Sequence, residues 1–258
     1  MHQIYTIIMS TSPLSNVFSA RRSIRKYTSQ NIDDELLNEL LEASFRSSNT
    51  GNMQLYSVVV TRDKEMKRKL APLHFNQPMI MQAPVVLTFC ADCNRFIKWC
   101  RQRNADPGFD NFQSFFTASI DAVIAAQTFC MAAESKGLGI CYIGTVTYLT
   151  QPIIDVLKLP KYVVPVATVT VGYPEIIPSQ PERLPLDAII HRETYHDYQP
   201  EDIDRLYFEK ENSEANKNYV KENNKETLAQ VFTDVRYTRK NNETFSESFL
   251  EAIKKQGF

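Results

Sequence analysis

The sequence lacks the features that would identify several large classes of protein. Its 258 residues carry 29 basic and 30 acidic side chains, so no overall charge favours binding to nucleic acid or to an anionic membrane. Five scattered cysteines, an odd number, give no disulfide framework and favour a reducing cytoplasm. No apolar run approaches the roughly 20 residues of a membrane span. We therefore expect a cytoplasmic protein with no nucleic-acid partner and no membrane partner.

Common nucleotide, hydrolase and metal motifs are also missing. Gly137, Gly139 and Gly144 lie close together without forming G-x-G-x-x-G, and G-x-x-x-x-G-K-[ST] does not occur. The four histidines are dispersed and the sequence has no G-x-S-x-G motif, so nothing indicates the catalytic triad of a hydrolase. Cys90 and Cys93 form a lone C-x-x-C without a second pair or a nearby histidine. We expect no bound metal, and we interpret Cys90 as a core residue.

One short basic segment stands out against this near-neutral background. Arg21, Arg22 and Arg25 place three guanidinium groups within five residues. Arginine carries a rigid fork of donors that matches phosphate oxygens two at a time, and a solvated basic turn is the simpler alternative. Ser12-Pro13 is typical of a helix start, so a short helix would hold the backbone of the segment. The sequence thus combines a candidate anion-binding segment with the absence of any catalytic motif. This combination is typical of an enzyme whose chemistry is carried out by a phosphate-bearing cofactor.

Hydrophobic periodicity predicts alternating strands and helices. Predicted strands cover residues 56–61, 84–90, 140–143 and 163–171. Predicted helices cover residues 31–45, 63–70, 112–136 and 151–159, with Gly137 as a left-handed cap after the third. The many alanines of 112–136 suit a buried central helix or a dimer interface, and a plain interior helix of a monomer fits them equally well.

The composition changes along the chain in a way that predicts three parts. Residues 1–11 are expected to be a dispensable N-terminal extension, with Met9 as a candidate start. Residues 12–199 would form the main body. Residues 200–258 are rich in charge and asparagine but keep helical apolar stripes, so we expect a helical excursion packed on that body.

A set of short segments then occurs in one order along the chain. The segments are Arg21–Arg25 with Tyr27, Ser48–Gln54, Gln77 ahead of Phe89–Asp92, Tyr142–Gly144, Lys158–Pro160, Val171–Pro174 and Arg183–Pro185. Together they resemble the nitroreductase family of FMN-dependent oxidoreductases, and specifically its oxygen-insensitive NADPH nitroreductase and flavin reductase branch. The resemblance runs from about residue 14 to the C-terminus.

This resemblance implies both a fold and an activity. The implied fold is α+β, with a mostly antiparallel central sheet flanked by helices, in a homodimer with FMN at the subunit interface. The implied enzyme is an NAD(P)H-dependent nitroreductase or flavin reductase that reduces nitroaromatics, quinones or free flavin by ping-pong hydride transfer. Two alternatives stay open: a member specialised for flavin breakdown, reductive dehalogenation or biosynthetic dehydrogenation, and a non-catalytic FMN-binding protein.

The resemblance also assigns the cationic residues of the FMN site. Arg21 and Ser23, with Arg22 adjacent, would hold the phosphate and ribityl end. Arg25 would lie near the flavin N1 and C2 carbonyl, where a fixed cation stabilises the charge that reduction brings. Arg183 is also placed among the cofactor-binding residues.

The remaining assigned residues would surround the flavin ring. Gln77 would bond to the pyrimidine side, and the N–H of Gly144 would face N5. The polar loop would reach the ring from the partner subunit through Ser48, Asn49 and Thr50. The segment that would lie along the isoalloxazine consists of Tyr142, Ile143, Gly144 and Thr145. No side chain is assigned as catalytic, because FMN carries the chemistry and Arg25 and Gly144 only assist.

Three positions depart from the pattern of the branch. Arg21 stands where the branch often has histidine, Pro181 where it has a lysine, and Thr145 where it tends to have a second glycine. NADPH and NADH both remain possible co-substrates. The cations available to select between them are Lys217, Lys221, Lys225, Arg236 and Arg239.

Overall fold

The computed structural model describes residues 13–258, and these residues divide into two compact units. The first unit contains the chain up to Ser179 together with Phe245–Phe258, and the second is Gln180–Thr244. The predicted dispensability of residues 1–11, the candidate start at Met9 and the helix cap at Ser12 all lie outside the described residues. The second unit overlaps the expected excursion but begins earlier, and the chain returns to the first unit before it ends.

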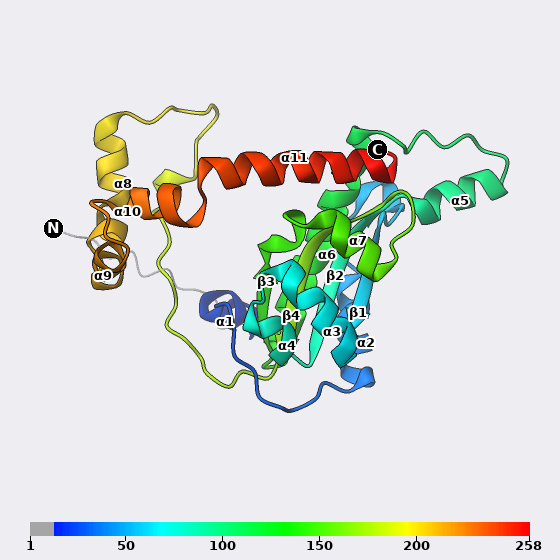
Figure 1. Cartoon of the computed structure of the whole chain (residues 1–258), viewed down its shortest axis with the longest axis horizontal. Helices are drawn as coiled ribbons and strands as arrows, with labels where there is room; N and C mark the ends of the chain where they lie inside the picture. Colours follow the sequence, from blue (N-terminus) through cyan, green and yellow to red (C-terminus); the bar gives the residue numbers. More distant parts are fainter. Residues whose placement is uncertain (1–12) are drawn as a thin grey trace. The chain divides into compact units, whose positions relative to one another are not determined.

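A four-stranded antiparallel sheet forms the centre of the first unit (Figure 1). Its strands are β1 (Tyr56–Thr61), β2 (Val85–Asp92), β3 (Gly139–Ile143) and β4 (Val163–Gly172), in the order β1-β2-β4-β3. Each pair of neighbours is antiparallel, with one register shift in β2 between Phe89 and Cys90. The structure therefore confirms the predicted antiparallel sheet, and all four predicted strands are present.

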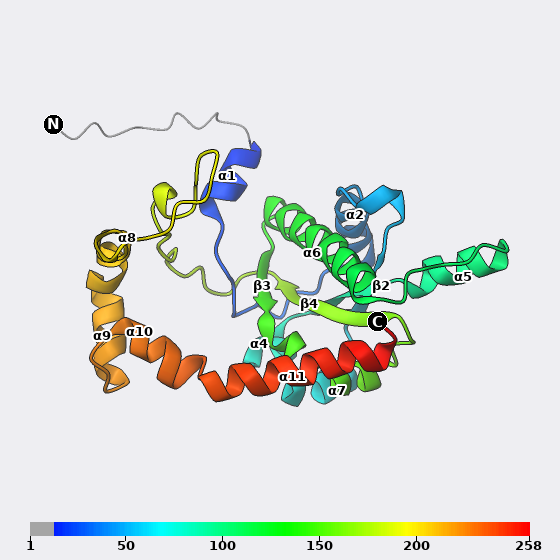
Figure 2. The same ribbon diagram turned by 90° about the horizontal axis from the view of Figure 1, so that it is seen from above.

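Helices cover both faces of this sheet, as Figure 2 shows from above. On one face, α2 (Asp34–Ser44) and α6 (Phe112–Ser135) pack with Leu87, Phe89 and Val169. On the other face lie α3 (Lys64–Leu70), α4 (Pro78–Gln82) and α7 (Thr150–Leu157). Two 3₁₀ turns, η2 (Ala71–His74) and η3 (Gly144–Thr147), complete that second layer. The predicted α+β class with flanking helices is confirmed.

Local capping explains where the main helices begin and end. Asp33 accepts a bond from Leu36 N at 2.7 Å to start α2, and Asn111 accepts one from Ser114 N at 3.1 Å to start α6. Gly137, with φ of +78°, follows the end of α6 as the sequence predicted. The remaining elements of the first unit are α1 (Pro13–Ala20), η1 (Thr50–Asn52), α5 (Asn94–Gln102) and the C-terminal part of α11 (Arg239–Gln256).

The segment that follows α1 runs beside β3 because a glycine allows it. Ile24 N donates to Ile140 O at 2.8 Å, which joins the basic segment to the edge of the sheet. A Cβ atom at Gly139 would lie 2.5 Å from the side chain of Ile24, so only glycine permits this approach. Tyr27 continues the contact through an antiparallel bridge to Pro174. The backbone of the arginine cluster is therefore held against the sheet.

The second unit is helical. Its elements are η4 (Leu186–Ala188), α8 (Pro200–Asn212), α9 (Glu214–Glu222), α10 (Leu228–Gln230), the π-helical turn η5 (Val231–Arg236) and the first residues of α11. Gln199 with Asp202 and Thr227 with Gln230 form capping boxes at α8 and α10. Lys210 lies over the ring of Phe232 at 5.7 Å. The unit therefore has its own caps and packing, and its helices agree with the helical stripes of the charged tail.

Candidate functional site

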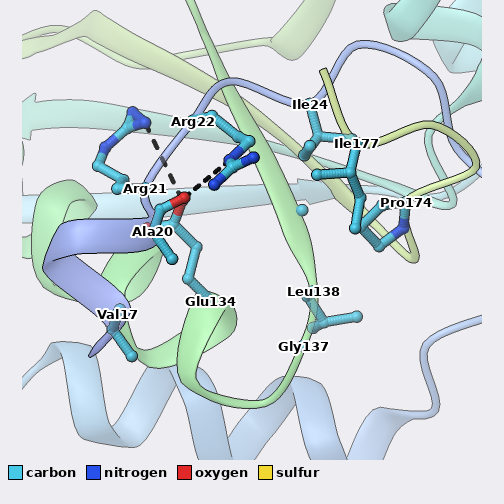
Figure 3. A pocket seen from close by; sticks show the side chains of 11 residues that line it. Val17, Ala20, Arg21, Arg22, Ile24, Glu134, Gly137, Leu138, Pro174 and Ile177 are labelled. Carbon is cyan, nitrogen blue, oxygen red and sulfur yellow. Dashed lines mark hydrogen bonds and ion pairs between the residues drawn. The ribbon is translucent and has the colours of Figure 1, made fainter. Parts of the chain in front are cut away.

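A cavity of about 240 Å³ lies where the arginine cluster meets the end of α6 (Figure 3). Its lining consists of Val17, Ala20, Arg21, Arg22, Ile24, Glu134, Gly137, Leu138, Gly139, Pro174 and Ile177. Figure 3 shows the side chains of Arg21, Arg22 and Glu134 pointing toward one another on one side of this space. Two of the three predicted guanidinium groups therefore converge on a single hollow.

The protein itself fixes both of these guanidinium groups. Arg22 Nε donates to Ala20 O at 2.8 Å and its Nη1 donates to Pro178 O at 3.1 Å. Arg21 Nη1 lies 4.0 Å from Glu134 Oε1. Burial raises the pKa of Glu134, and the positive charge of Arg21 opposes this shift. Glu134 Oε2 is buried and bonds to none of the described residues. The cavity thus combines two oriented cations with one incompletely compensated carboxylate.

The end of β3 provides a second, more open part of the site. Gly144 is exposed, and a Cβ atom built there would meet no heavy atom within 4 Å. Arg25 is also exposed, and it lies close enough to Cys141 that its charge lowers the pKa of this thiol against the upward effect of burial. Tyr142 is half-buried and Ile143 is buried beneath the strand end. The structure therefore brings the 21–25 and 142–145 segments together along one edge of the sheet.

Thr145 bonds to Gln77 and also to His74, a residue that the sequence did not indicate. The Gln77 side-chain amide donates to Thr145 Oγ1 at 3.3 Å, and His74 Nδ1 lies 2.9 Å from the same oxygen. Burial lowers the pKa of His74 to about 4. Since no motif surrounds His74 in the sequence, only the fold could reveal this contact.

The polar loop is anchored at a different place on α6. Thr50 N and Thr50 Oγ1 both donate to Asp121 Oδ1, at 2.9 and 3.1 Å. Asp121 precedes Glu134 by between three and four helical turns, roughly 20 Å at ~1.5 Å per residue. Within one chain, the predicted Ser48, Asn49 and Thr50 contacts are therefore held away from the arginines. Asp121 was not predicted; a carboxylate among the alanines of an apolar helix is the sequence signal that could have indicated it.

Arg183 belongs to the second unit, so it is described apart from the other assigned residues. Its Nη1 donates to Pro181 O at 3.2 Å and to Glu182 O at 2.9 Å. The candidate nucleotide cations of this unit are partly engaged, because Lys225 pairs with Asp234 at 3.0 Å. Three of these cations line one cavity of about 410 Å³: Lys217, Lys221 and Lys225.

The cysteines provide no reactive centre in the described part of the chain. Cys90 and Cys93 are both buried, and burial raises the pKa of Cys93 to about 12. Among residues 13–258, no group of three histidine, cysteine or acidic side chains could hold a metal ion. Cys90 therefore occupies a core position, as the sequence suggested.

The outward face of α6 is apolar as well. Contrary to the expectation from the sequence, this helix is long and apolar enough for a membrane span. Its buried face packs against the sheet through alanines, as in the core helix of a folded domain. The outward residues recur every three or four positions and are between 37% and 57% exposed. They are Phe112, Phe116, Ile120, Val123 and Ile124. A helix that is apolar on all sides is normally covered on all sides.

Known proteins share both the sequence and the fold of this chain. The Nitroreductase family model matches residues 18–173. The chain is 40% identical over 177 residues to FMN reductase (NAD(P)H) of Bacillus subtilis (strain 168), covering 67% of this chain and 71% of that protein. It is 29% identical over 184 residues to the oxygen-insensitive NADPH nitroreductase of Salmonella typhimurium, covering 71% and 75%.

Solved structures extend the similarity over nearly the whole chain. A Bacteroides fragilis protein described only as an oxidoreductase superposes with a TM-score of 0.93 at 59% identity, covering 94% of this chain and 98% of that one. The NfrA1 nitroreductase of Bacillus subtilis superposes with a TM-score of 0.81 at 27% identity, covering 93% and 98%. The match includes the second unit as well as the sheet.

Proposed function

This chain belongs to the nitroreductase family, and on that premise we propose that it is an NAD(P)H-dependent enzyme that reduces flavin, nitroaromatics or quinones with FMN. One observation carries the proposal: two oriented guanidinium groups face a cavity at the same sheet edge where Gly144 borders open space. When bound, FMN would accept a hydride from NADPH or NADH and then deliver electrons to the acceptor in a separate half-reaction. Five free, buried thiols support a reducing cytoplasm.

The residues along this edge fit the two ends of FMN. Arg21 and Arg22, together with Ser23, would hold the phosphate, since both guanidinium groups line the cavity and the protein already holds them in place there. Arg25 would supply a positive charge at the pyrimidine edge of the ring. Gly144 would leave room for the ring to approach the backbone, because a side chain there would occupy the open space. The chain's own contribution is thus binding, orientation and charge.

The arginine cavity supports a specific prediction about Glu134. Replacing Glu134 by glutamine removes a partly buried negative charge from the place where we assign the phosphate. At the effective permittivity of such a site, relief of this repulsion is worth about 1 kcal/mol, so the dissociation constant of FMN is expected to fall about five-fold. Quenching of FMN fluorescence on binding to the apoprotein measures this constant.

Glu39→Gln provides the matched control for this change. Glu39 lies on α2 and pairs with Lys136 at 2.6 Å, so its replacement alters the net charge equally while leaving the cavity intact. This variant is expected to bind FMN like the wild type. Weaker binding of FMN by Glu134→Gln would show instead that Glu134 is needed to hold Arg21, and would contradict the assigned repulsion.

We also infer a homodimer in which each site is completed by the second copy. The apolar outward stripe of α6 supports an interface between copies of this chain, since it would otherwise face water. The loop is anchored to Asp121, roughly 20 Å along α6 from the arginine cavity of the same chain. This distance supports a contribution of Ser48, Asn49 and Thr50 to the partner's site instead. The same loop could then contact a flavin held by the other chain.

A visible absorption spectrum of the purified protein tests the proposal directly. We expect a yellow protein that binds one FMN per chain and bleaches on anaerobic addition of one equivalent of NADPH or NADH. The faster donor in separate cuvettes identifies the preferred nucleotide, and nitroaromatic, quinone and free flavin acceptors should then restore the oxidised spectrum. Colourless protein that takes up no added FMN would refute the proposal.

A further inference from the structure

A completely buried histidine bonds to the proposed cofactor site. His74 ends η2, and its Nδ1 lies 2.9 Å from Thr145 Oγ1. The Gln77 side-chain amide donates to the same oxygen at 3.3 Å. Two side chains from one short segment therefore converge on a single hydroxyl group next to Gly144.

The backbone between His74 and Gln77 brings these two side chains together. Phe75 and Asn76 have φ values of +54° and +53°, a left-handed conformation that asparagine tolerates and that is unfavourable for phenylalanine. Asn76 N donates to Ala71 O at 2.8 Å and Gln77 N donates to His74 O at 3.1 Å, which closes the turn. The turn therefore directs Gln77 back to the oxygen that His74 already contacts.

The surroundings of His74 decide which ring nitrogen carries its proton. Burial keeps the ring neutral by lowering its pKa to about 4, so it has one N–H. A proton on Nε2 would be buried without an acceptor, since that atom bonds to none of the described residues. If the proton is on Nδ1, it is donated to Thr145 Oγ1, and only the lone pair of Nε2 is left without a hydrogen-bond donor. Because unpaired buried N–H groups are rare and costly, the second arrangement is favoured.

This arrangement fixes the direction of the Thr145 hydroxyl group. Its oxygen accepts from both His74 and Gln77, which uses both lone pairs, so its own proton must be donated elsewhere. Thr145 is half-buried, and the open space borders the adjacent Gly144. We propose that Thr145 is a fixed hydrogen-bond donor to the bound flavin and that His74 is the residue that positions it, an inference that rests on the proposed function.

Two replacements of Thr145 separate its hydroxyl group from its shape. Thr145→Val keeps the shape and removes the donor, so FMN binding to the apoprotein, measured by fluorescence quenching, is expected to weaken about five-fold to ten-fold. The visible absorption band of bound flavin should shift as well. Thr145→Ser keeps the hydroxyl group and is expected to stay within about two-fold of wild type. Full affinity and an unchanged spectrum in Thr145→Val would overturn the proposal.

The positioning role of His74 is tested through its dependence on Thr145. His74→Leu removes the N–H and is expected to weaken FMN binding about three-fold, because the hydroxyl group is free to rotate. In His74→Asn, the side-chain amide replaces Nδ1–H and should restore affinity. Added to Thr145→Val, His74→Leu should cause no further loss, since both changes act on one hydrogen bond. Additive losses would show that His74 acts only by packing and would overturn its positioning role.

The outcomes also distinguish this inference from the proposed function. If the wild-type protein takes up no FMN, both fail. If the wild type binds FMN and Thr145→Val is indistinguishable from it, only the present inference fails. The Thr145 variants lie at a half-buried position and decide the donor role even if His74→Leu does not fold.

Discussion

Ile120→Arg is expected to convert the proposed dimer to a monomer that retains little FMN. Ile120 lies in the middle of the outward apolar stripe of α6 and is 44% exposed in a single chain. In a symmetric interface the substitution places two unpaired guanidinium groups in an apolar contact, which costs several kcal/mol. The dissociation constant of the dimer should therefore rise at least about 100-fold. Sedimentation analysis measures the mass, and the flavin absorbance of the same sample measures retention.

Val60→Arg is the matched control for this prediction. Val60 lies on the edge strand β1 and is 41% exposed, so it gives the same new charge at an apolar position of similar exposure. We expect this variant to stay dimeric and yellow. A dimeric Ile120→Arg protein would exclude the α6 stripe as the interface. A monomer that retains FMN fully would show instead that each site is complete within one chain.

Local chemistry explains why most elements could be predicted from the sequence. Strand β1 occupies the predicted residues 56–61, because its run of β-branched residues from Val58 to Thr61 strongly favours a strand. Helix α6 ends at Ser135, one residue before the predicted end, with the predicted cap at Gly137. Strand β2 continues to Asp92, two residues beyond the prediction. The Asp92 carboxylate accepts a bond from Ser57 Oγ on β1, a contact that no local pattern encodes.

Contacts between distant segments explain what the sequence could not predict. Asp121 and His74 are buried and Glu134 is half-buried, and the bonding partners of all three lie far away along the chain. Contacts between distant segments also explain why the C-terminal boundary of the helical excursion was not predicted. Composition predicted that the excursion continues to Phe258. Ile253 packs with Leu55, so Phe245–Phe258 belong to the first unit instead.

The candidate site was predicted from the order in which several short segments occur along the chain, because no single motif identifies it. The arginine cluster indicated an anion, but its position beside β3 depends on the absence of a side chain at Gly139. Thr145 stands where the branch tends to have a second glycine, and the structure adds its bonds to His74 and Gln77. The FMN contacts themselves remain predictions that binding measurements must test.

Gly144→Ala is expected to impair FMN binding while leaving the apoprotein intact. A Cβ atom at this position meets no protein atom within 4 Å, and the residue has no left-handed φ, so alanine should fit without strain. Replacing glycine in a permitted conformation usually stabilises a protein by about 0.4–1 kcal/mol through the unfolded chain. The melting temperature of the apoprotein should therefore be equal or slightly higher.

The cofactor should respond to Gly144→Ala in the opposite direction. If the flavin ring lies against this backbone, the added methyl group overlaps it at a cost of about 1–3 kcal/mol, which weakens FMN binding about five-fold to 150-fold. Gly108→Ala is the matched control, because Gly108 also has no atom within 4 Å of a built Cβ and no left-handed φ. Both variants should show the same melting behaviour, and only Gly144→Ala should lose FMN. Equal FMN affinity in the two variants would mean that the open space at the end of β3 is filled by solvent in the holoenzyme, which would move the flavin away from β3.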